Sequence, residues 1–135
     1  MTVIVGYLPT PEGEAAILEA EEQASRFGDD LVLVNSAHGG AYVDSALAQP
    51  AALEALVADI EGRGAVNVKV YQRTDAQDPT EEILDLVEST QARLLVIGLR
   101  RRSPVGKLFL GSTAQALLLK APCPVLAVKA HSGNR

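Results

Sequence analysis

The chain has 135 residues, 47% of them hydrophobic, and a formal net charge of −5 at pH 7. This length fits one compact domain, which we expect to span residues 1–130 ahead of a disordered tail at 131–135. The acidic balance argues against nucleic acid or a membrane surface as a partner, and without a signal-peptide or spanning segment the protein is expected in the cytoplasm.

The first half of the chain predicts two buried strands and two helices. Short apolar runs at Thr2–Gly6 and Leu31–Ser36 are typical of strands in a parallel sheet that is covered on both faces. An apolar stripe at helical spacing predicts a helix over Pro11–Phe27, which Gly28 ends as a C-terminal cap. A second helix is expected from about Pro50 to Glu61.

The third strand is expected at the edge of the sheet. Val66–Tyr71 alternates apolar and polar residues, a pattern that fits a strand less buried than its neighbours. Asp78 and Pro79 follow as the N-cap and first residue of a helix that runs to Thr90.

The last third of the chain predicts strand, loop, helix and strand. The strands are Leu94–Ile97 and Val125–Val128, and the helix opens at Gly111–Thr113 and runs to Lys120. Strands that alternate with helices predict an α/β fold, a five-stranded parallel sheet of order 3-2-1-4-5 with helices on both faces. The winding direction reverses between the first and fourth strands, and ligands bind beyond the carboxyl ends of the strands at such a switch point.

The loop after the fourth strand has the composition of an anion site. Arg101 and Arg102 belong to a cationic run in an otherwise acidic chain. The helix start that follows offers unpaired N–H groups and the positive end of its dipole, Gly111 lets a phosphate approach the backbone, and Ser112 and Thr113 add hydroxyl donors. Two plainer interpretations stay open: an ordinary serine or threonine N-cap, and a solvated arginine run.

The loop after the first strand faces this cationic loop in the predicted topology. It contains Pro9 and Thr10, and Thr10 either contacts a ligand or stabilises the turn. Cys123 is the only cysteine, which excludes an intrachain disulfide, and His38 has no metal-ligand partner nearby in the sequence. Because no nucleophile is paired with a base, the sequence predicts binding without turnover, and not an enzyme.

These motifs resemble those of the universal stress protein family, whose ATP-binding members carry Gly-x2-Gly-x9-Gly-Ser/Thr after the fourth strand. Gly98, Gly111 and Ser112 stand at matching spacings, and Cys123–Leu126 resembles the family's Cys-Pro-Val strand entrance. The resemblance covers nearly the whole chain. It implies a single-domain Rossmann-like fold of the adenine nucleotide alpha hydrolase-like type and a homodimer that pairs final strands. A dimer would also cover the apolar edge at Val125–Val128.

The same resemblance implies that the chain binds ATP or another adenine nucleotide, with or without Mg²⁺. Ser36, at the end of the second strand, would offer backbone groups to the adenine edge. The implied nucleotide-binding residues are Pro9, Thr10, Ser36, Gly98, Arg101, Arg102, Gly111, Ser112 and Thr113.

Two positions depart from the family pattern. Arg101 occupies the place of the second motif glycine, and Leu8 stands where nucleotide-binding members carry aspartate. Leu8 has no side-chain acceptor for a ribose or a base. Three hypotheses follow: a nucleotide-binding regulatory or stress-response module, a dimeric stress protein that acts through protein contacts without ATP, and a weak hydrolase that uses a loop-bound water and a divalent ion.

Overall fold

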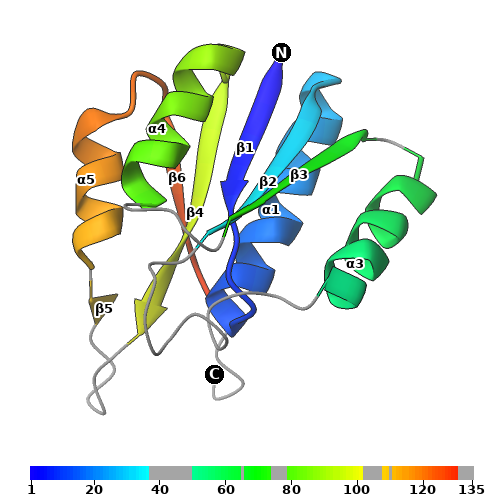
Figure 1. Ribbon diagram of the computed structural model, residues 1–135, viewed down its shortest axis with the longest axis horizontal. Coiled ribbons are helices and arrows are strands. Elements are labelled where there is room, and N and C mark those ends of the chain that lie inside the picture. The colour runs from blue at the N-terminus through cyan, green and yellow to red at the C-terminus, as the bar shows by residue number, and fades with distance from the viewer. Residues whose placement is uncertain (37–49, 65, 74–78, 102–107, 110, 131–135) are drawn as a thin grey trace.

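The computed structural model describes residues 1–36, 50–64, 66–73, 79–101, 108–109 and 111–130 (Figure 1). Strands and helices alternate along the chain in the order that the apolar runs predict. The elements are β1 (Thr2–Gly6), α1 (Pro11–Phe27), β2 (Asp30–Ser36), α3 (Pro50–Gly62), β3 (Val68–Arg73), α4 (Pro79–Thr90), β4 (Leu94–Arg101), β5 (Leu108–Phe109), α5 (Ser112–Lys120) and β6 (Val125–Lys129). The expected N-cap Asp78 and the expected tail at 131–135 lie outside the described residues.

The sheet confirms the predicted order. β3, β2, β1, β4 and β6 pair in parallel in that sequence, so β6 takes the place of the expected fifth strand. β1 lies between β2 and β4, with Val5 opposite Leu33 on one side and Val96 on the other. The winding therefore reverses between β1 and β4, as the switch-point prediction requires.

The end of β4 and the short strand after it differ from the prediction. β4 continues to Arg101, beyond the expected end at Ile97, because Leu99 pairs with Lys129 of β6 and Arg101 pairs with Leu108 of β5. β5 is a two-residue strand antiparallel to the end of β4, and its two residues are too few for a periodic signal in the sequence.

β3 begins two residues later than predicted and runs farther. Val68 is the first residue in register with β2, opposite Leu31, and the pairing continues to Arg73. Val66 is buried in the core, but it lies before the first residue of β3 that pairs with β2. Its apolar side chain therefore reflects burial and not strand pairing. Among the described strands β3 pairs only with β2, which agrees with the predicted edge position.

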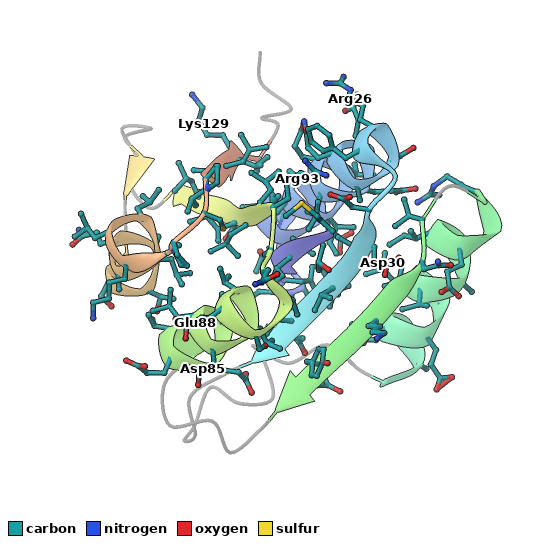
Figure 2. All side chains as sticks on the ribbon, turned by 90° about the horizontal axis from the view of Figure 1, so that it is seen from above. Arg26, Asp30, Asp85, Glu88, Arg93 and Lys129 are labelled. Carbon is teal, nitrogen blue, oxygen red and sulfur yellow. The ribbon has the colours of Figure 1, made fainter. Side chains whose placement is uncertain are left out.

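The helices form a layer on each face of the sheet. α1 and α3 cover one face, and α4 and α5 cover the other (Figure 2). β1 shows the division directly, because Val3 and Val5 pack into the core beneath α1 and α3 while Ile4 packs beneath α4 and α5. A strand buried on both faces needs apolar residues at successive positions, which explains the continuous apolar runs in β1, β2 and β4.

The edge of the sheet where the strands begin carries a part-buried ion pair, in which the Asp29 carboxylate is buried and Arg93 is partly exposed. Arg93, labelled in Figure 2, donates from Nε to Oδ2 of Asp29 at 2.6 Å and lies over the ring of Phe27 at 4.5 Å from its centroid. The hydrogen bond from Arg93 holds the pKa of the buried Asp29 carboxyl below its ordinary value. Within the described residues, no helix is long and apolar enough to cross a membrane.

Candidate functional site

The candidate site lies where β1 and β4 end. Figure 1 shows α1 and α5 both beginning at the edge of the sheet to which these two strands point. α1 departs to one face and α5 to the other. We call this region, the carboxyl ends of β1 and β4 with the N-termini of α1 and α5, the switch-point edge.

Thr10 is the N-cap of α1. Its backbone is extended, with φ −134° and ψ 164°, and its Oγ1 accepts a hydrogen bond from the N–H of Gly13 at 3.1 Å. The side chain therefore has a structural role in the helix, and its hydroxyl proton can still be donated. Pro9 directly precedes this cap, in the connection between β1 and α1. Glu12 and Glu14 add negative charge to the first turn of α1, so the positive end of this helix dipole is already compensated by side chains of the helix itself.

Two glycines let α1 approach its neighbours closely. A Cβ at Gly13 would lie 1.8 Å from the carbonyl oxygen of Leu8, and a Cβ at Gly98 would lie 2.6 Å from the carbonyl oxygen of Glu12. Side-chain atoms do not tolerate such distances, so both positions need glycine for packing alone. Gly98, which the family resemblance implies as a nucleotide-binding residue, lies within β4 and lets the start of α1 approach that strand.

The start of α5 has no side-chain cap. Gly111 is its N-cap, with φ −68° and ψ 169°, and the first helical hydrogen bond runs from the N–H of Gln115 to the carbonyl of Gly111 at 2.9 Å. Ser112 and Thr113 are the first two helical residues, so the ordinary N-cap role considered for them belongs to Gly111. The first turn contains no acid, in contrast to α1. Its N–H groups and the hydroxyls of Ser112 and Thr113 form a start suited to an anion.

Neither the backbone angles of Gly111 nor the described residues around it require a glycine. Its φ is one that any residue adopts, and no atom of the described structure lies within 4 Å of the position that a Cβ would take. Gly13 and Gly98, in contrast, are required by packing, and Gly28 adopts a left-handed φ of 69°. The missing side chain at Gly111 therefore leaves open backbone at the N-terminus of α5.

The other predicted site residues lie on the ends of neighbouring strands or outside the described residues. Ser36 ends β2, opposite Arg73 of β3. Arg101, which the sequence places in a loop, is instead the last residue of β4 and is paired with Leu108. Arg102 lies outside the described residues, as does His38.

Sequence reasoning missed a polar row beside the predicted residues. Nδ2 of Asn35 donates to the carbonyl oxygen of Tyr7 at 2.9 Å, and Nε2 of Gln72 donates to Oδ1 of Asn35 at 2.8 Å. The hydroxyl of Tyr7 donates to Oε2 of Glu14 at 2.6 Å. Burial and this carboxylate raise the pKa of Tyr7. Asn35 is fully buried, and the available signal was an amide at the end of an otherwise apolar strand.

The described residues contain no group of three His, Cys, Asp or Glu side chains placed to hold a metal ion. Cys123 is half-buried, and burial raises the pKa of its thiol, which opposes the thiolate that a nucleophile or a metal ligand requires.

Comparisons with known proteins agree with one another. The model of the universal stress protein family matches residues 1–129. A universal stress protein from Mycolicibacterium smegmatis is 44% identical over 129 residues, which cover 96% of this chain and 98% of the relative. The solved universal stress protein from Archaeoglobus fulgidus is 29% identical, with a TM-score of 0.76 over 96% of this chain and 98% of that one. A universal stress protein from the same organism in complex with dAMP is 23% identical, with a TM-score of 0.69 and the same two coverages.

Proposed function

Because the chain belongs to the universal stress protein family, we propose that it binds an adenine nucleotide at the switch-point edge and acts as a nucleotide-responsive regulatory module in a stress response. The observation that carries this proposal is the open backbone at Gly111, where neither the backbone angles nor any described neighbouring atom calls for glycine. The dAMP complex of a related fold supports an adenine nucleotide as the ligand class.

The phosphates belong at α5 rather than α1. The N–H groups at the start of α5 and the hydroxyls of Ser112 and Thr113 would donate to phosphate oxygens, and the helix dipole favours their charge. α1 has a side-chain cap at Thr10 and acids in its first turn, both of which oppose a second anion there. Arg101 and Arg102 would add charge from the end of β4 and the residue after it, and Mg²⁺ would accompany ATP as its counter-ion.

The nucleoside belongs toward β1 and β2. Pro9 and Thr10 would line one side from the connection between β1 and α1, with Gly98 letting the start of α1 lie close to β4. Ser36 would offer its backbone to the base from the end of β2, the strand beside β1. We propose binding without committed turnover, because the proposed contacts are donors and charges rather than a nucleophile paired with a base.

A second candidate is a dimeric protein in the cytoplasm that acts through protein contacts without ATP. Leu8 supports it, because its side chain offers no acceptor to a nucleoside. β6 supports the dimer, since among the described strands it pairs only with β4 and its residues Val125–Val128 are half-buried. Pairing with β6 of a second copy would complete this edge.

Titration calorimetry with ATP and AMP, with and without Mg²⁺, on protein stripped of co-purified nucleotide tests the proposal. We expect Gly111→Ala to weaken binding at least tenfold, about 1.4 kcal/mol, because its Cβ enters the space that a phosphate needs. Gly111→Ser adds the same Cβ and also a side chain that can cap the helix, so a loss of binding in both variants assigns the effect to the ligand and not to the cap.

Gly62→Ala is the matched control. Gly62 ends α3, and a Cβ there also meets nothing within 4 Å of the described structure. We expect this variant to bind as the wild type does. Absence of heat and of retained nucleotide in the wild-type protein would overturn the proposal in favour of the ATP-independent dimer.

A further inference from the structure

The face of the sheet beneath α1 and α3 is built of rows that run across three strands. Val5, Leu33 and Val70 form one such row, because each is in register with the next. The next row toward the carboxyl edge replaces apolar residues with polar ones: Tyr7, Asn35 and Gln72. The core of this face therefore ends in a polar row, beside the connection that begins the candidate site.

The row is a directed chain of hydrogen bonds. The carbonyl of Tyr7 can only accept, so the Asn35 amide must turn its Nδ2 toward it, at 2.9 Å. This orientation of the amide points Oδ1 of Asn35 toward β3, where Nε2 of Gln72 donates to it at 2.8 Å. The backbone of Tyr7 thus sets the orientation of both amides.

Tyr7 is held at each of its polar groups. Its N–H donates to the carbonyl of Val34 at 2.8 Å, its carbonyl accepts from Asn35, and its hydroxyl donates to Glu14. Leu8 follows directly, and its carbonyl oxygen accepts from the N–H of Thr10 at 2.8 Å. The position of Tyr7 therefore determines where the connection to α1 starts.

We propose that Asn35 and Gln72 are positioning residues of the nucleotide site, which hold the Tyr7 carbonyl and so place Leu8–Thr10 against the ligand. This inference rests on the proposed function. Asn35 is fully buried at the centre of the row, whereas Gln72 is exposed on the edge strand. A side chain on β3 thereby influences ligand affinity without touching the ligand.

Gln72→Met removes the hydrogen bond to Oδ1 of Asn35 without adding charge, at an exposed position where the fold tolerates the change. We expect it to weaken AMP binding about fivefold, the ratio that one ordinary intramolecular hydrogen bond represents. In the ligand-free protein, hydrogen exchange at the Thr10 amide should accelerate. Val70→Met, on the same face of the same strand, is the matched control and should alter neither quantity.

Asn35→Asp is the more severe test, because it places a carboxylate oxygen against the Tyr7 carbonyl oxygen in a buried position. If Asn35→Asp fails to fold, the result with Gln72→Met decides the question. If the wild type binds AMP and Gln72→Met matches it in affinity and exchange, the positioning role is overturned and the proposed function stands. If the wild type binds no AMP, the proposed function fails, and the positioning role fails with it.

Discussion

Replacing Gly98 with alanine should destabilise the fold because of a single backbone contact. The new Cβ would lie 2.6 Å from the Glu12 carbonyl oxygen, which must retreat by about 0.8 Å to reach ordinary contact at 3.4 Å. The obstacle is main chain, so no side-chain rotation relieves it. The start of α1 has little freedom to retreat, because Thr10 caps it and Tyr7 is bonded to Glu14.

Overpacking of this kind costs about 1–3 kcal/mol. At about 2.1 cal/mol/K of unfolding entropy per residue, a chain of 135 residues loses roughly 4–10 °C in melting temperature. Thermal unfolding followed by circular dichroism measures the shift. Gly111→Ala should lose at most about 1 kcal/mol, from the weaker N-cap preference of alanine, so the two motif glycines separate into one needed by the fold and one proposed for the ligand.

Gly6→Ala is the matched control for Gly98→Ala. Gly6 lies on β1, and among the described residues a Cβ there meets Ile83 at 3.6 Å and Ile97 at 3.9 Å, both ordinary contacts with side chains. We expect this variant to melt close to the wild type. A Gly98→Ala protein that melts as high as Gly6→Ala would refute the packing argument, and Gly98 would then return to the candidate ligand residues.

Two further predictions concern pH and assembly. The folded-state pKa of Asp29 lies below its ordinary value of 3.8. The ionised carboxylate therefore stabilises the fold at pH values above 3.8, and this stabilisation is lost as the pH falls through the folded-state pKa. Asp29→Asn should therefore unfold at a lower urea midpoint than the wild type at pH 7, and the two should converge below about pH 4; a constant difference across this range would contradict the assignment. Sedimentation equilibrium at tens of micromolar should give twice the chain mass of 14.2 kDa if β6 pairs between copies, and a monomer mass would argue against that edge as the interface.

The sheet could be predicted from the sequence because burial on both faces leaves continuous apolar runs. β1 and α1 have the predicted bounds, and the helical crossovers account for the parallel pairing of the strands in the predicted order. β5 could not be predicted, since its pairing with Arg100 and Arg101 is a tertiary contact rather than a local pattern. The polar row was missed for a similar reason, because Asn35 and Gln72 are 37 positions apart in the sequence.

The structure also changes what the substitution at the second motif glycine means. In a tight loop, an arginine at position 101 would strain the backbone or block it. Arg101 instead ends β4 and is paired with Leu108, an extended strand position where any residue other than proline fits. The departure from the glycine motif therefore carries no conformational penalty. The open backbone that the proposed phosphate contact requires lies at Gly111, ten residues later, where α5 begins.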